Sequence, residues 1–137
     1  MMVTAEAPRT PRAWLRLAMQ ELRAAEQAYG NRNARGGLLG AKRAAGMALR
    51  GALLLAPDPR YGRSYVQHLA GLATDDTAPE AVRLAARNLH GAAATSVEIV
   101  VLRAPKTDEK LLEAARDVMA HAYAVVVRHE AHASDPS

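Results

Sequence analysis

The chain has 137 residues and a formal net charge of +4, and half of its residues are hydrophobic although it contains no Phe and one Trp. This length suits one domain with one core and is too short for two independent cores. Because the chain has no Cys, disulfides and thiolate chemistry are excluded. No apolar run approaches the roughly 20 residues that span a bilayer, and Glu6 lies where a signal peptide has its apolar core. We therefore expect a cytoplasmic protein with no membrane partner.

The first predicted helix covers Pro11 to Tyr29. A core of Leu, Val, Met and abundant Ala favours helices over strands. Thr10 supplies a hydroxyl cap, and Pro11 suits the first helical position. The sequence GNRN at 30–33 ends the helix. Apolar residues recur inside it at the three-to-four spacing of a buried stripe, namely Leu15, Ala18, Leu22, Ala25 and Tyr29.

The second predicted helix ends before Pro57. Gly36, Gly37 and Gly40 predict a flexible loop near its start, and they lack the spacing of a phosphate-binding P-loop. Further along, Gly46 and Gly51 each cost about 1 kcal/mol relative to Ala inside a helix. We therefore expect a neighbouring helix to approach closely at these two positions.

A short helix is predicted from Ser64 to Ala73, followed by a long one. Thr77 and Glu80 have the spacing of a capping box. The run SVEIVVL is rich in β-branched residues but keeps the helical register. The pattern therefore predicts one helix from about Pro79 to Leu102, closed by Pro105.

The last predicted helix opens at Thr107, with Asp108 and Glu109 in its first turn, where the helix dipole favours negative charge. The tail HEAHASDPS is predicted to fray. The core stripe of this last predicted helix consists of Leu111, Ala115, Val118, Ala122, Val125 and Val126. The expected fold class is all-α, an up-and-down helical bundle of four long helices plus one short helix. We expect one domain over residues 1–137, with an ordered core at about 11–130.

Basic residues are concentrated in the first part of the chain. Residues 1–56 hold nine Lys or Arg against three acids, and no acid lies between Glu26 and Asp58. Lys42, Arg43 and Arg50 fall in this stretch and are candidate nucleotide- or RNA-binding residues. The alternative is a solvated helix face beside a basic loop.

A second group of candidates lies in RLAARNLH, residues 83–90. Viewed along a helix axis, Arg87 lies about 40° from Arg83 in one direction, and His90 lies about 20° from Arg83 in the other. The three side chains therefore share one face and span about 10 Å along the axis. Arg can hold phosphate oxyanions, and His can exchange a proton with a ribose hydroxyl near neutral pH. Two alternatives stay open: anion binding without catalysis, and the solvated flank of an amphipathic helix.

Other motifs point to structure. The histidines of HEAH at 129–132 are three positions apart, not four as in the HExxH metalloprotease helix. We therefore expect no metal site, and we expect no cofactor. His121 and Tyr123 are expected at an interface or partly buried, and Trp14 as a core or dimer anchor.

The order of segments resembles the HEPN domain family (higher eukaryotes and prokaryotes nucleotide-binding). The resemblance spans roughly Arg12 to Arg128. It rests on AWLRLAMQELRAAEQAYG, a short basic loop, and GAKRAAGMALRGALLL. In QHLAGL at 67–72 the two leucines match, but Gln and His stand where the family often has His and Asp. In VVLRAP at 100–105, Arg103 and Pro105 match the family's Arg-Tyr-Pro, and Ala104 replaces the Tyr.

The resemblance implies a homodimer that binds a nucleotide, RNA or a small nucleotidyltransferase partner without robust catalysis. Other family members are metal-independent endoribonuclease toxins of toxin–antitoxin pairs, as in bacteria, and use an Arg and a His four to six residues apart. Six residues lie between Arg83 and His90, which satisfies this loose spacing, but Gly91 and Ala92 follow the His where the family often has an aromatic residue. A third alternative is a structural helical interaction module. Family membership does not choose among them.

Overall fold

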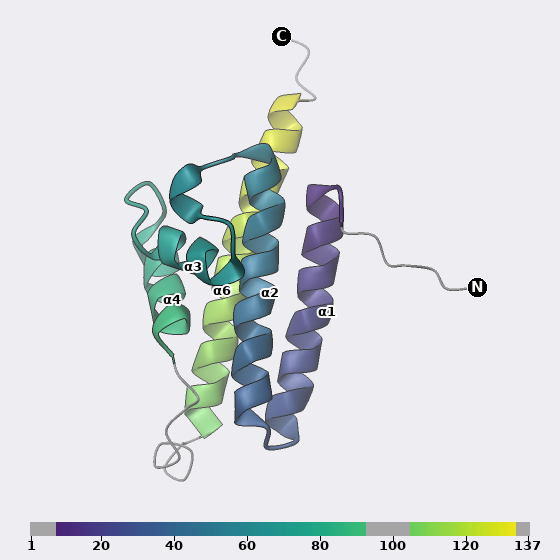
Figure 1. Ribbon diagram of the computed structural model, residues 1–137, viewed down its shortest axis with the longest axis vertical. Coiled ribbons are helices and arrows are strands. Elements are labelled where there is room, and N and C mark those ends of the chain that lie inside the picture. Colours follow the sequence, from purple (N-terminus) through teal and green to yellow (C-terminus); the bar gives the residue numbers. More distant parts are fainter. Residues whose placement is uncertain (1–7, 93–104, 134–137) are drawn as a thin grey trace, which may run out of the picture.

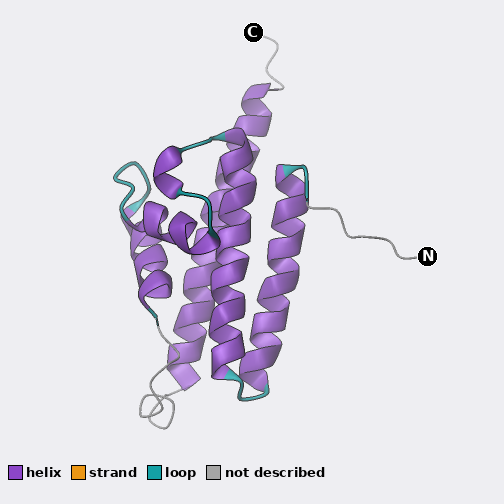
Figure 2. Ribbon diagram, in the orientation of Figure 1, coloured by secondary structure: helices purple, strands orange, loops and turns teal. Residues whose placement is uncertain are grey.

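In the computed structural model, residues 8–92 and 105–133 are described, and every regular element in these ranges is helical (Figures 1 and 2). The expected all-α class is confirmed for them. Three helices are long: α1 (Pro11–Gly30), α2 (Ala34–Leu55) and α6 (Pro105–Ala133). Between α2 and α6 lie the one-turn 3₁₀ helix η1 (Pro59–Tyr61), α3 (Tyr65–Ala73) and α4 (Glu80–Gly91). None of the helices in the described ranges is long and apolar enough for a bilayer.

Helix α2 is the central element. It contacts α1, α3, α4 and α6. It runs antiparallel to α1 and in the same direction as α6, while α3 and α4 lie on the side away from α1 (Figure 1). Ala and Gly residues are buried along most of the length of α2. Because these side chains are small, neighbouring helices can approach α2 closely on several sides.

The start of α2 corrects one prediction. The glycines at 36, 37 and 40 lie inside the helix and not in a loop, and Asn33 caps it by accepting a hydrogen bond from the Gly36 amide at 2.9 Å. A Cβ at Gly37 would lie 2.7 Å from the ring of Tyr29, and one at Gly40 would lie 2.9 Å from the Cβ of Ala25. These glycines therefore seat α1 against α2.

Gly46 and Gly51 act as the sequence predicts. A Cβ at Gly46 would lie 2.8 Å from the Cα of Tyr65 in α3, and one at Gly51 would lie 2.9 Å from the Cβ of Trp14 in α1. The two glycines thus admit different neighbours. The predicted cap of α1 is also confirmed, because Thr10 accepts a hydrogen bond from the Ala13 amide at 3.1 Å.

Helix α4 differs from the prediction at both ends. Its N-cap is Pro79, and no side chain caps its first turn, so the predicted Thr77–Glu80 capping box is wrong. The helix stops at Gly91, and Ala92 is extended with φ −70° and ψ 135°. One continuous helix through Leu102 is therefore also wrong. Lys42 binds the Ala92 carbonyl at 2.7 Å and fixes this end. Residues 93–104, with the Arg103 and Ala104 of the family comparison, lie outside the described ranges.

Helix α6 is longer than predicted at both ends. It begins at Pro105, which had been expected to close the preceding helix, because a proline fits a first helical turn that needs no amide donor. The HEAH segment does not fray: it continues α6, and Glu130 accepts hydrogen bonds from Arg12. The predicted core stripe is confirmed, with Leu111, Ala115, Val118, Ala122 and Val126 buried and Val125 packed against the core.

Candidate functional site

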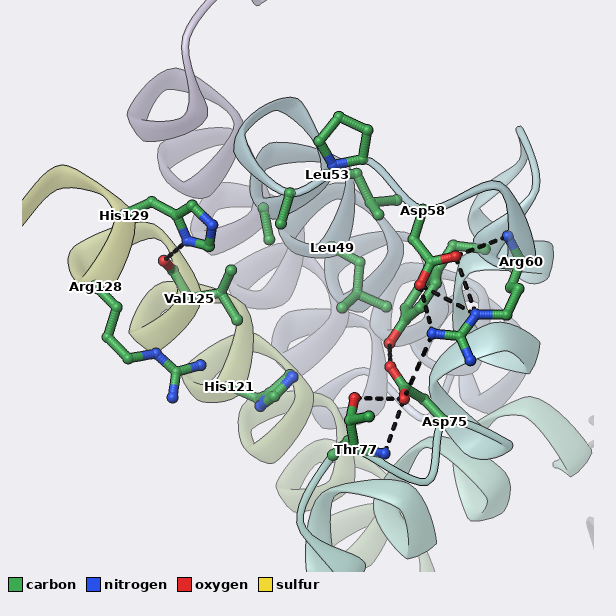
Figure 3. A pocket seen from close by; sticks show the side chains of 15 residues that line it. Leu49, Leu53, Asp58, Arg60, Asp75, Thr77, His121, Val125, Arg128 and His129 are labelled. Carbon is green, nitrogen blue, oxygen red and sulfur yellow. Dashed lines mark hydrogen bonds and ion pairs between the residues drawn. The ribbon is translucent and has the colours of Figure 1, made fainter. Parts of the chain in front are cut away.

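A pocket of about 340 Å³ lies between the C-terminal end of α2, η1, the loop joining α3 to α4, and α6 (Figure 3). Leu49, Leu53 and Val125 are among the apolar residues that line it. Polar side chains stand on two opposing walls, one from η1 and the α3–α4 loop and one from α6 (Figure 3). A concave apolar space with a few polar groups around it is the usual form of a small-molecule site.

The first wall is built around the carboxylate of Asp75, which is buried in the α3–α4 loop. Tyr61 donates its hydroxyl to this carboxylate at 2.6 Å, and Thr77 donates its hydroxyl at 2.6 Å and its amide at 3.0 Å. Burial acts to raise the pKa of Asp75, but the hydrogen bonds from Thr77 and Tyr61 outweigh it, and the pKa falls below its ordinary value. Asp75 is therefore charged and fully engaged within the protein.

Arg60 completes the first wall. Asp58 caps η1 by accepting the Arg60 amide at 3.0 Å, and it also accepts the Arg60 guanidinium at 2.7 Å. The same guanidinium lies 3.9 Å from Asp75. Arg60 thus faces two charged carboxylates, so this wall is net negative and Arg60 offers no unpaired positive charge to a ligand.

The second wall is basic and belongs to α6 (Figure 3). His121 is half-buried, and its pKa is lowered first by burial and then by the positive charge of Arg128. His129 donates its Nδ1–H to the Val125 carbonyl at 2.9 Å, which leaves Nε2 as an acceptor. Arg128 is exposed and makes no hydrogen bond or ion pair with any residue in the described ranges. A cation here is therefore available to an anionic ligand.

A second hollow, of about 570 Å³, continues the site past His121 and Arg128 to the start of α4. Its lining includes Ala81 and Val82 of the first turn of α4. No side chain caps this turn, so its amides have no acceptor within the helix. Free amides at a helix N-terminus attract anions. We call the pocket, this hollow and the two α6 side chains between them the α4–α6 site.

The six candidate residues from the sequence lie elsewhere and are not gathered into one site. Lys42 binds backbone carbonyls at the C-terminal end of α4, and burial lowers its pKa. Arg43 pairs with Glu21 of α1 at 3.8 Å. Arg50 turns toward α3, where its guanidinium lies 4.3 Å from the ring centre of Tyr65. These three cations therefore serve three different helix contacts.

The RLAARNLH candidates are likewise separated. Arg83 is partly buried and lies 3.7 Å from Asp76 at the start of α4. Arg87 and His90 are exposed, and His90 is at the far end of the helix. No contact within the described ranges joins Arg83 to His90, and neither lines the α4–α6 site.

Asp75, Thr77 and Arg128 were not predicted as site residues from the sequence, and His121 was predicted at an interface or in a partly buried pair. His121 and Arg128 are seven residues apart, two turns of one helix, and this spacing could have signalled a shared face. Their position opposite the start of α4 depends on packing between distant segments. The pocket contains no Cys, and no group of three metal-ligating side chains occurs among the described residues.

The chain matches no protein-family model, no curated protein and no solved structure. The site consists of a partly apolar pocket joined to a hollow at an uncapped helix N-terminus, and the hollow is lined by Arg128 and His121 and also by Asp117.

Proposed function

We propose that this chain is a HEPN-like helical domain that binds a nucleotide at the α4–α6 site without robust catalysis of its own. The observation that carries the proposal is the position of Arg128 and His121 beside the uncapped first turn of α4. The homodimer, the cytoplasmic location and the up-and-down arrangement of helices expected from the sequence are part of this proposal.

The phosphate and the base of a nucleotide each have a counterpart in the site. The first turn of α4 can bind a phosphate group, because the backbone amides of Ala81 and Val82 and the guanidinium of Arg128 can donate hydrogen bonds to its oxygens. His121 can add a hydrogen bond to a phosphate oxygen. A base suits the pocket lined by Leu49 and Leu53, whose volume of about 340 Å³ is in the lower range of small-molecule sites.

The walls explain why binding rather than catalysis is proposed. Asp75 already accepts hydrogen bonds from Tyr61 and Thr77, and its lowered pKa keeps it deprotonated at neutral pH. It is therefore poorly placed to act as a general acid. Among the titratable groups that a ligand could reach, His121 has no acidic partner within hydrogen-bonding distance among the described residues to orient its ring.

RNA and a nucleotidyltransferase are the other partners that the resemblance implies. A long RNA needs a continuous basic surface for successive phosphates. Lys42, Arg43 and Arg50 are engaged with three different neighbours, which favours a small ligand. The ribonuclease alternative needs Arg83 and His90 to act together, and no contact among the described residues joins them.

Calorimetric titration at low salt with ATP, GTP, AMP and inorganic phosphate tests the proposal. We expect one of the nucleotides to bind, and we expect Arg128→Ala and His121→Ala each to weaken binding by roughly tenfold or more. Arg87→Ala is the matched control, because this exposed residue of α4 lies outside the site. Absence of binding by every nucleotide would overturn the proposal and favour a structural module.

The same protein preparations separate binding from catalysis. We expect single-stranded RNA incubated with the wild type and EDTA to remain intact. Cleavage that disappears in both Arg83→Ala and His90→Ala would replace the proposed function with the endoribonuclease alternative.

A further inference from the structure

An apolar groove runs along the seam between α1 and α6. Its volume is about 460 Å³, and its lining is mostly hydrophobic, with Leu15, Met19, Leu22, Met119 and Tyr123 among its residues. Met19 is 44% exposed and Tyr123 is 49% exposed, so each helix presents one large side chain to solvent. The groove borders the α4–α6 site on α6, and of the lining residues given for the two only Ala120 is common to both.

Each end of this seam carries an ion pair that joins the two helices. At one end Arg12 of α1 lies 2.6 Å from Glu130 of α6. At the other end Glu26 of α1 lies 3.6 Å from Arg116 of α6. The four charged residues, which we call the corner residues, alternate in sign around the groove, because α1 and α6 run in opposite directions (Figure 1).

The register of the corner residues is the same on both helices. The two on α1 are 14 positions apart, and so are the two on α6, which corresponds to about 21 Å along each axis. Met19 is the midpoint of the first pair, and Tyr123 is the midpoint of the second. The seam is therefore a rectangle with opposite charges at adjacent corners and an exposed apolar side chain halfway along each long side.

We propose that this seam is the surface through which two copies of the chain associate. A twofold axis lying along the seam places α1 of one copy over α6 of the other. That rotation brings each Arg corner opposite a Glu corner and places Met19 opposite Tyr123 of the second copy. Such a self-complementary patch is what a twofold homodimer requires, and a methionine against an aromatic ring is a favourable contact.

The other basic residues of α1 select this axis. Arg16 and Arg23 are exposed and lie on the same side of α1 as Met19. A twofold axis across the helices would place α1 over α1 and bring these arginines of the two copies together. Placing α1 over α6 avoids that repulsion.

The area of the seam determines how tightly the two copies are expected to associate. Two helices side by side over the 20-residue length of α1 present roughly 600 Å², against roughly 800 Å² per partner in a standard interface. We therefore expect a reversible dimer. The inference specifies the homodimer of the proposed function, but its evidence is independent of nucleotide binding, so either can fail alone.

Sedimentation velocity over a micromolar to millimolar concentration series provides the first test. The wild type should shift from monomer to dimer, and Met19→Glu should weaken association by roughly tenfold or more. Val66→Glu is the control, because Val66 is an exposed apolar residue of α3 away from the seam. Circular dichroism checks that both variants fold. A wild type that stays monomeric throughout, or equal weakening by both variants, would overturn the proposal.

Inverting the corner charges provides the second test. The variant R12E/E26R/R116E/E130R keeps opposite charges within each chain and keeps the seam self-complementary. We expect it to dimerise as the wild type does. Mixed with labelled wild type, it should form heterodimers at least about tenfold more weakly, because every corner then meets its own sign. Free mixing of the two proteins would show that they associate through another surface. Calorimetry on the monomeric Met19→Glu variant shows separately whether nucleotide binding survives.

Discussion

The hydroxyl of Tyr61 donates a 2.6 Å hydrogen bond to the buried carboxylate of Asp75. This bond joins η1 to the α3–α4 loop, two segments that form one wall of the α4–α6 site (Figure 3). Thr77 binds the same carboxylate, so the loop that leads into α4 is fixed by the same group. The position of the first turn of α4 therefore depends on a small buried polar network.

Tyr61→Phe should lower the free energy of unfolding by about 1–3 kcal/mol, because it removes a donor from a buried carboxylate. Urea denaturation measures the change. Tyr123→Phe is the control: its hydroxyl accepts a hydrogen bond from Arg12 at an exposed position, and its loss should cost less than about 0.5 kcal/mol. Equal losses in the two variants would contradict the role given to Asp75.

His68 should make stability depend on pH. It is 3% exposed, and burial lowers its pKa although its hydrogen bond to the Tyr61 carbonyl opposes the shift. The unfolded state therefore binds the proton more readily. Stability should be full above the unfolded pKa of about 6.5 and should fall as the pH drops from there toward the lower folded pKa.

His68→Asn isolates this contribution, because Asn does not titrate and can still donate to the Tyr61 carbonyl. His121 also has a lowered pKa and contributes to both proteins. We expect the stability difference between wild type and variant to shrink as the pH falls below about 6.5. A difference that stays constant from pH 8 to pH 5 would show that His68 does not titrate on unfolding.

Gly46→Ala should destabilise the fold by about 1–3 kcal/mol, because the added methyl group overlaps Tyr65 of α3. Gly30→Ala is a matched control in α1, since its Cβ would meet nothing within 4 Å and Ala is the better helix former. Thermal melting distinguishes the two. Equal melting temperatures would mean that α3 does not approach α2 as closely as described.

Lys42→Met should lower stability by about 1 kcal/mol, the usual net value of a hydrogen bond, because Lys42 binds the carbonyls of His90 and Ala92. Amide hydrogen exchange should rise in the last turn of α4. Nucleotide affinity should not change. A large loss of affinity with unchanged stability would return Lys42 to the binding site expected from the sequence.

Helix positions were predictable where local pattern decides them. Thr10 and Pro11 mark the start of α1 correctly, and the stripe of α6 from Leu111 to Val126 is buried as expected. Gly46 was correctly predicted as a close approach because glycine inside a helix is costly unless it serves packing. These signals lie within one helix and need no knowledge of its neighbours.

Errors occurred where distant segments decide the structure. Thr77 and Glu80 match the capping-box pattern, but Thr77 instead binds Asp75, whose carboxylate is fixed by Tyr61. The end of α4 is held by Lys42 from another helix. Charge spacing selected basic residues, but spacing along one helix does not tell which of them already has a partner in the folded chain.

Binding of a nucleotide phosphate at the first turn of α4 is the basis of the proposed function. It is tested most directly by amide chemical-shift mapping in ¹⁵N-labelled protein, titrated with the nucleotide that binds most tightly in calorimetry. We expect the largest shifts at Ala81 and Val82, and their loss in Arg128→Ala. Shifts centred on Arg87 and His90, with Ala81 and Val82 unmoved, would contradict the account.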